Sequence, residues 1–132
     1  MSLKYLGSKN ILIVEDDAFN IQLIRSILTK VSDMYLISSH DGAGALSILE
    51  YDEVKIDMIL LDIRMPIMNG QDLLVHIRQN RKFDDIPVLI ISVDERNESE
   101  LLSIGANDFI LKPFDIDDLT AKISTNFDKK IK

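Results

Sequence analysis

Short apolar runs alternate with amphipathic segments along most of this 132-residue chain. Each run is rich in branched residues, is too short for a helix that spans a core, and suits a strand buried on both faces. The expected strands are 11–14, 34–37, 58–61, 88–91 and 109–111. After each strand, apolar residues recur at three- and four-residue steps, which predicts a helix. The expected helices contain 21–31, 45–49, 73–77, 101–104 and 119–127.

Five strands that alternate with five helices predict a parallel sheet with helices on both faces. We expect an α/β fold of the flavodoxin-like kind, a doubly wound (βα)5 sandwich with strand order 2-1-3-4-5. One domain would occupy residues 10–127, after an N-terminal extension at 1–9 and before a polar C-terminal tail at 128–132. Gly105 is expected to stop the fourth helix, and Asp115 to cap the fifth.

Charge and composition limit the classes of function. The net charge of −7 argues against direct binding of nucleic acid, which relies on Lys and Arg to neutralise phosphates. The same charge suits a cation site, although a solvated acidic surface explains it equally well. The chain has no cysteine, so thiolate metal sites are excluded and a reducing cytoplasm is compatible. Because no apolar run approaches the ~18 residues of a membrane helix, we expect a cytoplasmic protein without membrane contact.

Carboxylates stand at the ends of two of the expected strands. Glu15 and Asp16 follow the first strand, and Asp62 ends the third. These strands are neighbours in the order given above, so the three carboxylates would converge at one edge of the sheet. Their repulsion requires protons or a cation, and oxygen ligands in an open cleft suit Mg²⁺. Taken singly, Asp62 could equally cap a loop, and Asp17 could cap a helix instead of binding metal.

Two further polar residues close the fourth and fifth expected strands, on the far side of Asp62. Ser92 offers a hydroxyl donor and Lys112 a fixed positive charge. With the carboxylates they supply what phosphoryl transfer needs: a nucleophile that can form an acyl phosphate, and groups that neutralise the transferred oxygens. Singly, each has a plainer interpretation as a strand-end hydroxyl or a surface charge. His40 and His76 are isolated and are interpreted as structural or solvated.

The chain resembles the receiver domain of two-component response regulators from about Asn10 to Phe127. The matching motifs are ILIVEDD at 11–17, DG at 41–42 with AL at 45–46, LDIRMP at 61–66 with NG at 69–70, PVLIIS at 87–92, and GANDFILKPF at 105–114. The resemblance implies a phosphorylation-activated signalling switch, not a turnover enzyme. Asp62 would accept a phosphoryl group from a phosphohistidine on a sensor histidine kinase or a histidine phosphotransfer protein.

The resemblance also implies a set of metal ligands around the phosphoacceptor. Mg²⁺ (or Mn²⁺) would be bound by Asp16, Asp62 and the backbone carbonyl of Arg64. Glu15 would act largely through a water molecule. The phosphorylation reaction would therefore depend on the metal.

The resemblance further implies how phosphorylation is sensed. Ser92 and Lys112 would contact the phosphoryl oxygens, and the Lys112–Pro113 bond is usually cis in this family. Phe109 matches an aromatic switch position, whose ring would move inward as Ser92 is drawn toward the phosphate. The face made by the fourth helix, fifth strand and fifth helix would then change, and a phosphorylation-dependent dimer through that face is one form of output.

Three positions depart from the commonest pattern of the family. Ser92 replaces the more frequent Thr, Phe109 stands where Tyr is common, and Val93 stands where a small residue is usual. Arg64 and Asp94 lie two residues past Asp62 and Ser92, so their side chains would flank the phosphoryl group. We expect these two side chains to pair as a lid that, with Val93, slows dephosphorylation. The plainer alternative is that both point to solvent and Val93 only packs.

Two other functions compete with the signalling switch. A phosphatase of the haloacid dehalogenase type also uses a strand-end Asp and Mg²⁺, but it needs a second Asp two residues on, where this chain has Arg64. A receiver that acts as an unphosphorylated interaction module is the other alternative. The intact set of Asp16, Asp62, Ser92 and Lys112 disfavours it.

Overall fold

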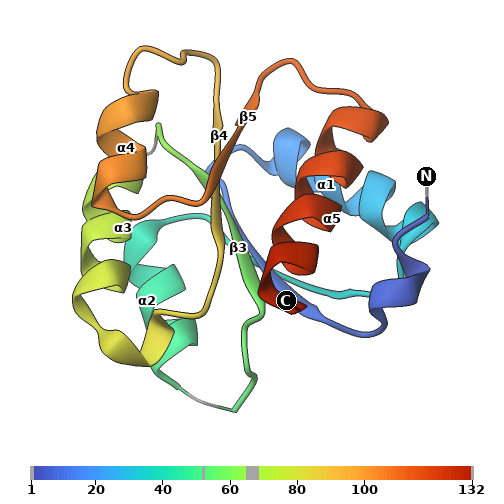
Figure 1. The fold of residues 1–132 in the computed structure, drawn as a ribbon, viewed down its shortest axis with the longest axis horizontal. Helices are drawn as coiled ribbons and strands as arrows, with labels where there is room; N and C mark the ends of the chain where they lie inside the picture. Colours follow the sequence, from blue (N-terminus) through green and yellow to red (C-terminus); the bar gives the residue numbers. More distant parts are fainter. Residues whose placement is uncertain (1, 52, 65–68, 132) are drawn as a thin grey trace.

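The computed structural model describes residues 2–51, 53–64 and 69–131, with side chains as far as Lys129 (Figure 1). Strands and α-helices alternate along the described chain, which confirms the α/β pattern expected from the sequence. The elements are β1 (Asn10–Val14), α1 (Ala18–Val31), β2 (Tyr35–Ser39), α2 (Gly42–Glu50), β3 (Met58–Asp62), α3 (Gly70–Gln79), β4 (Val88–Ser92), α4 (Glu98–Ile104), β5 (Asp108–Leu111) and α5 (Ile116–Ile131). Two short 3-10 helices, η1 (Lys4–Leu6) and η2 (Arg81–Phe83), were not expected.

The sheet is parallel, with strand order β2-β1-β3-β4-β5, as predicted. Helices α1 and α5 cover one face, and α2, α3 and α4 cover the other (Figure 1). The register pairs Val14 with Leu61, Asp62 with Ile91, and Ser92 with Leu111. The carboxyl ends of the four strands that carry the candidate site therefore lie at one edge.

Successive residues of the central strand β3 fill two separate cores. Ile59 and Leu61 point into the core under α2, α3 and α4, whereas Met58 and Leu60 point into the core under α1 and α5. All four side chains are completely buried, and burying an aliphatic side chain of this size stabilises a fold by roughly 1.5–3 kcal/mol. The two-sided burial explains why β3 is a continuous apolar run that ends on Asp62.

The N-terminal extension is part of the fold. Leu3 and Leu6 are buried in the core under α1 and α5. The backbone N–H of Leu3 donates to the carbonyl of Val31 at the end of α1, at 2.7 Å. The hydroxyl of Tyr5 lies 2.8 Å from that of Ser124 on α5. At the other end of the chain, the backbone of 128–131 continues α5 as a helix.

Several helix ends are set by the residues that the sequence indicated. The carboxylate of Asp17 accepts the N–H of Phe19 and caps α1, so the capping interpretation of Asp17 is confirmed. Asp115 accepts the N–H of Asp118 at 2.8 Å, as expected of the cap of α5. Gly105 ends α4 with a φ of 132°, a region that favours glycine. No helix in the described part of the chain is both long and apolar enough to cross a membrane.

Candidate functional site

The three carboxylates expected at the sheet edge lie together. One carboxylate oxygen each from Glu15, Asp16 and Asp62 falls within 4.8 Å of the other two. Glu15 and Asp62 are only 2% and 6% exposed, whereas Asp16 faces solvent at the start of the β1–α1 loop. Strand order explains the convergence, because β1 and β3 are neighbours and both end here. Two buried carboxylates beside an open one make a strongly negative cleft.

Lys112 supplies a cation inside this cleft. Its Nζ lies 3.1 Å from Oε1 of Glu15 and 3.7 Å from Oδ2 of Asp62, and its side chain is 19% exposed. Burial raises the pKa of the Glu15 carboxyl, the neighbouring carboxylate of Asp62 raises it further, and Lys112 opposes both effects. One ammonium group thus offsets part of the charge of three carboxylates. The cleft keeps a net negative charge that a further cation can neutralise.

The donor set fits Mg²⁺. All of the candidate ligands are oxygens, and the exposed carboxylate of Asp16 leaves room for the water molecules that Mg²⁺ retains. The described residues place Asp16, Asp62 and Glu15 where such an ion would lie. The proposed part of the Arg64 carbonyl stays a prediction.

An Asp16→Asn variant should bind Mg²⁺ at least about tenfold more weakly than the unmodified protein, since even the partners of metal ligands contribute about 10–100-fold. The substitution removes one charged oxygen ligand. Asp17→Asn is the matched control, because it removes the same charge one residue away while Asn still caps α1. Calorimetric titration with Mg²⁺ measures both. Equal weakening in the two variants would show that overall charge, not ligation by Asp16, sets the affinity.

Close packing of α3 against the end of β3 positions the phosphoacceptor candidate. A Cβ atom on Gly70 would lie 2.6 Å from both the carbonyl oxygen of Asp62 and the Cα of Ile63, so only glycine fits. Asn69 caps α3 by accepting the N–H of Asp72 at 2.9 Å. The N–H of Arg64 donates to Oδ1 of Asp62 at 3.0 Å. The Met65–Pro66 part of the expected motif lies outside the described residues.

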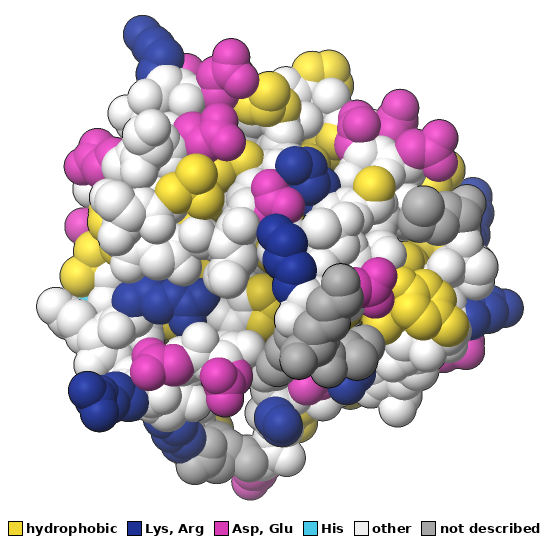
Figure 2. All heavy atoms as spheres, in the orientation of Figure 1, with side chains coloured by type: hydrophobic (Ala, Val, Ile, Leu, Met, Phe, Trp, Pro, Cys, Tyr) yellow, Lys and Arg dark blue, Asp and Glu magenta, His cyan; other side chains and the backbone are white. Residues whose placement is uncertain are grey.

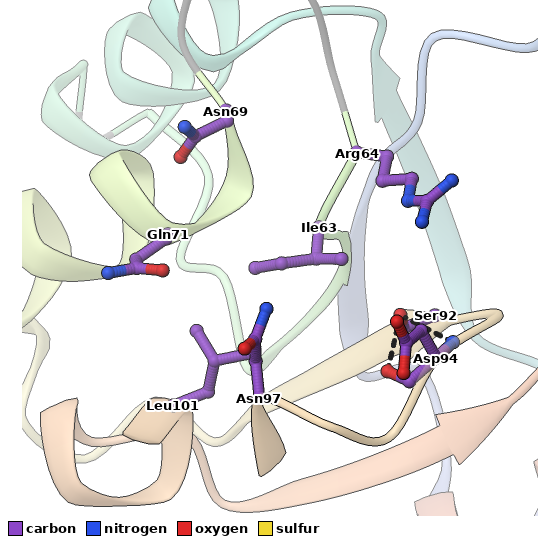
Figure 3. A pocket seen from close by; sticks show the side chains of 8 residues that line it. All are labelled: Ile63, Arg64, Asn69, Gln71, Ser92, Asp94, Asn97 and Leu101. Atoms are coloured by element: carbon purple, nitrogen blue, oxygen red, sulfur yellow. Dashed lines mark hydrogen bonds between the residues drawn. The ribbon is translucent and has the colours of Figure 1, made fainter. Parts of the chain in front are cut away.

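A cavity of about 540 Å³ opens between the starts of α3 and α4, and it is lined by Ile63 and Arg64, which follow Asp62, and not by Asp62 itself (Figure 3). Ser92 lines it and is only 3% exposed. The Ser92 hydroxyl donates to the carbonyl of Asp94 at 3.0 Å and accepts the Asp94 N–H at 3.1 Å, the two dashed contacts in Figure 3. In this structure the hydroxyl is therefore engaged by its own loop.

The residues of the expected lid are placed on the loops around this cavity. The carboxylate of Asp94 pairs with Arg96, at 2.6 Å and 2.7 Å, and this pairing lowers the pKa of Asp94. The Arg64 side chain is exposed and lowers that pKa as well, through a longer-range attraction. Val93 is 56% exposed, so it does not simply pack into the core. An Arg64–Asp94 pair would thus require Asp94 to exchange partners.

Phe109, the aromatic residue of the expected switch, lies in β5, and the bond expected to be cis follows that strand. The Phe109 ring is only 5% exposed and packs in the core under α2, α3 and α4. It occupies this inward position while the Ser92 hydroxyl is still bound to Asp94. The Lys112–Pro113 peptide bond is cis, as the resemblance implied.

Comparison with known proteins places this chain in a family. The response regulator receiver domain family matches residues 11–124. The chemotaxis protein CheY of Thermotoga maritima is 34% identical over 109 residues, which cover 80% of this chain and 87% of that protein. The sensor histidine kinase TmoS of Ectopseudomonas mendocina is 33% identical over 123 residues, 92% of this chain and 12% of its own length. This chain also spans less than half the length of several other curated relatives.

A solved structure shows the same fold around a magnesium ion. It is the receiver domain of the sensor histidine kinase PA1611 from Pseudomonas aeruginosa PAO1, with a magnesium ion coordinated in its active-site cleft. The two structures share a TM-score of 0.79 and 24% identity, over 90% of this chain and 97% of that one. With the match over 11–124 and the likeness to CheY, the chain belongs to the response regulator receiver domains of two-component systems.

Proposed function

We propose that this chain is a phosphorylation-activated signalling switch, and that Asp62 accepts a phosphoryl group from a phosphohistidine. The donor would be a sensor histidine kinase or a histidine phosphotransfer protein. The convergence of three carboxylates within 4.8 Å, with the Lys112 ammonium 3.7 Å from Asp62, supports the proposal most directly. The relative TmoS is by name a sensor histidine kinase, which is consistent with such a donor.

The transfer needs little covalent chemistry from the protein. A carboxylate oxygen of Asp62 forms a bond to phosphorus as the P–N bond of the phosphohistidine breaks, and the electron pair of that bond stays on the imidazole nitrogen. Lys112, which already faces Asp62, would stabilise the charge on the transferred oxygens. Mg²⁺ held by Asp16, Asp62 and the Arg64 carbonyl, with Glu15 acting through water, would supply further positive charge.

One experiment separates this proposal from the two competing functions. The purified protein is incubated with acetyl phosphate, with and without Mg²⁺, and its intact mass is measured. A switch gains one phosphoryl group per chain only when Mg²⁺ is present. An unphosphorylated interaction module gains none. A phosphatase releases phosphate catalytically from other phosphoesters, which are tested in parallel, and that result would replace the proposal.

Phosphorylation should alter the exchange of backbone amides with deuterium in residues 94–112. The Ser92 hydroxyl must exchange the carbonyl of Asp94 for a phosphoryl oxygen, which frees the loop that leads into α4. The change biases a two-state equilibrium and makes no new fold. Beryllofluoride with Mg²⁺ mimics the phosphoryl group, and mass spectrometry reads the exchange. The edge strand β2 (Tyr35–Ser39) is the internal control. Unchanged exchange in 94–112 with the mimic bound would contradict this coupling.

We also predict that Arg64 and Val93 prolong the life of the acyl phosphate, because both side chains would flank the phosphoryl group and crowd the approach of the attacking water. Arg64→Ala and Val93→Ala should each lose phosphate faster. For the ion pair, an exposed contact of about 0–1 kcal/mol gives at most roughly a fivefold change in rate. Arg96→Ala is the opposite test: it releases Asp94 to pair with Arg64, so loss of phosphate should slow. If neither Ala variant at 64 or 93 dephosphorylates faster, the lid does not exist.

Four further parts of the proposal remain predictions. The domain would work in the cytoplasm, would not turn over a substrate, and would contact neither nucleic acid nor membrane directly. The domain would also signal through the face made by α4, β5 and α5, and a phosphorylation-dependent dimer through that face is one form of this output. Cell fractionation tests the first, and analytical ultracentrifugation with beryllofluoride tests the last.

A further inference from the structure

The two ends of α4 are held differently, and the firmly held end rests on Arg78. This residue lies in the last turn of α3, which runs beside α4 on the same face of the sheet (Figure 1). Its guanidinium donates to the carbonyl of Gly105, the residue that ends α4, at 2.9 Å. It also donates to the carbonyls of Phe83 and Ile86, at 2.9 Å and 2.7 Å. The planar fork of the guanidinium thus joins the end of α4 to the chain between α3 and β4.

Two further contacts strengthen this junction. A Cβ atom on Gly105 would lie 2.7 Å from Cγ of Arg78, so the stem of the arginine lies directly against the end of α4. The side-chain oxygen of Asn107 accepts from Arg78 at 3.0 Å and from the N–H of Val88 at 2.9 Å. The N–H of Asn107 donates to the carbonyl of Val88 at 2.8 Å. These residues form what we call the Arg78 clamp (Arg78, Gly105 and Asn107), which ties the end of α4 to α3 and to the first residue of β4.

The beginning of α4 lacks such ties. Among the described residues, the hydrogen bonds of the preceding loop (94–97) stay within that loop and the adjoining ends of β4 and α4. Asn97 gives α4 no side-chain cap, and the amide of Gln71 donates to Glu100 from α3 in an exposed contact of 3.3 Å. Leu101 is the only buried side chain of α4, all of which the structure describes. The other side chains over α4 lie at the surface shown in Figure 2.

Open space lies beside this loosely held end. The cavity of about 540 Å³ between the starts of α3 and α4 is lined on the α4 side by Asn97 and Leu101 (Figure 3). None of the three clamp residues, all of which the structure describes, lines it. A helix that is fixed at one end and borders a cavity at the other can turn about its fixed end, as elements do at a hinge.

We propose that α4 works as a lever on the Arg78 clamp. When Asp62 carries a phosphoryl group, the loop 94–97 and the first turns of α4 shift, while the clamp holds Gly105 and Asn107 in place. The proposal rests on the proposed function, because it states which part of the segment 94–112 responds to phosphorylation. Arg78 is then a positioning residue, which gives α4 a fixed point so that a small change at the site turns the helix and does not loosen the whole segment.

The first test needs no phosphorylation. Nuclear magnetic resonance follows the exchange of single backbone amides with deuterium in the free protein. Arg78→Met keeps an apolar stem against Gly105 but leaves three carbonyls without their donor. The amides of 105–107 should therefore exchange at least about tenfold faster, because unpaired buried carbonyls favour local opening.

Arg81→Met is the matched control for this substitution. It removes the same charge three residues away, where the exposed side chain forms no hydrogen bond or ion pair with described residues. Exchange at 105–107 should stay within about twofold of the unmodified rate, as is usual for surface substitutions. Equal effects of Arg78→Met and Arg81→Met would overturn the proposal.

The second test adds beryllofluoride and Mg²⁺ to the unmodified protein, so its result stands even if Arg78→Met folds poorly. Exchange should change at least about threefold in 94–101 and stay within about twofold at 105–107, since only the loosely held part is free to respond. In Arg78→Met the change should extend to 105–107.

The outcomes separate the lever from the proposed function. A change of equal size in 94–101 and 105–107 of the unmodified protein would overturn the lever and leave the proposed function intact. A bound mimic that changes neither part would overturn the lever together with the coupling on which it rests. Absence of Mg²⁺-dependent phosphate uptake in the intact-mass experiment would overturn the proposed function, whereas the exchange rates of the free protein test the clamp independently of it.

Discussion

An Asp62→Asn variant is expected to gain no phosphoryl group from acetyl phosphate and Mg²⁺, at any time of incubation. An amide oxygen of the same size is too weak a nucleophile to form the acyl phosphate. The variant should also be more stable to unfolding than the unmodified protein when Mg²⁺ is absent. The amide removes one of three carboxylates that lie within 4.8 Å, and it relieves the repulsion that helps to raise the pKa of Glu15.

The control for this variant is Asp41→Asn. Asp41 caps α2 by accepting the N–H of Gly44 at 2.7 Å, and Asn keeps that capping bond. The Asp41→Asn substitution therefore changes the net charge by the same amount as Asp62→Asn, and it should leave phosphate uptake intact. Intact mass measures uptake, and urea titration measures stability. A phosphoryl group on the Asp62→Asn protein would show that another residue is the acceptor.

A Lys112→Met variant is expected to take up phosphate about 10²–10³-fold more slowly, the usual cost of removing one group that stabilises developing negative charge. Lys112 is the one ammonium near Asp62 among the described residues, at 3.7 Å. Met keeps most of the length of the side chain. Because Lys112 also contacts Glu15 at 3.1 Å, its loss leaves two buried carboxylates without that counter-charge. Mg²⁺ should therefore stabilise this variant more than it stabilises the unmodified protein.

Lys122→Met tests whether the effect depends on position. Lys122 is 44% exposed and pairs with Asp108 at the start of β5, whereas Lys112 follows the end of that strand. Its removal should leave the rate of phosphate uptake within about twofold, since an exposed pair contributes at most ~1 kcal/mol and lies outside the reacting groups. Rates of uptake from acetyl phosphate at saturating Mg²⁺ compare the two variants. Similar rates in both would mean that Lys112 has no special part in the transfer.

The fold could be predicted from the sequence because strand and helix signals agree along the chain. The apolar run at 58–61 is buried on both faces, and its neighbours in the sheet follow from the order of the elements. The packing of the N-terminal segment could not be foreseen. Leu3 and Leu6 are too few for a periodic pattern, and their burial depends on a surface that only α1 and α5 create together.

The part of the candidate site that depends on topology could be predicted from the sequence, and the part that depends on local geometry could not. The approach of Glu15 and Asp16 to Asp62 follows from strand order alone. The bond between the Ser92 hydroxyl and its own loop depends on a rotamer that no pattern encodes. Asp94 pairs with Arg96 in the structure, although two arginines were available in the sequence. A partner two residues away needs almost no loop closure, which favours it over Arg64.

Other interactions were missed because their partners are scattered along the chain. The guanidinium of Arg78 donates to the carbonyls of Gly105, Phe83 and Ile86 and to the side chain of Asn107, and it joins the end of α3 to the turn before β5. Burial lowers the pKa of Arg78, which is consistent with a structural clamp. The Asn-Gly pair in the sequence predicts a turn, but it does not reveal how closely Gly70 fits against the backbone of Asp62.

Mapping the phosphorylated residue tests the central claim most directly. The protein is incubated with acetyl phosphate and Mg²⁺, the acyl phosphate is reduced with borohydride, and peptides are sequenced by tandem mass spectrometry. Reduction converts a phosphorylated aspartate into homoserine, which marks its position. We predict homoserine at position 62 alone, and none when Mg²⁺ is removed with a chelator. Homoserine at position 16 or 17, or at 62 in the absence of Mg²⁺, would contradict the assignment of acceptor and metal ligands made here.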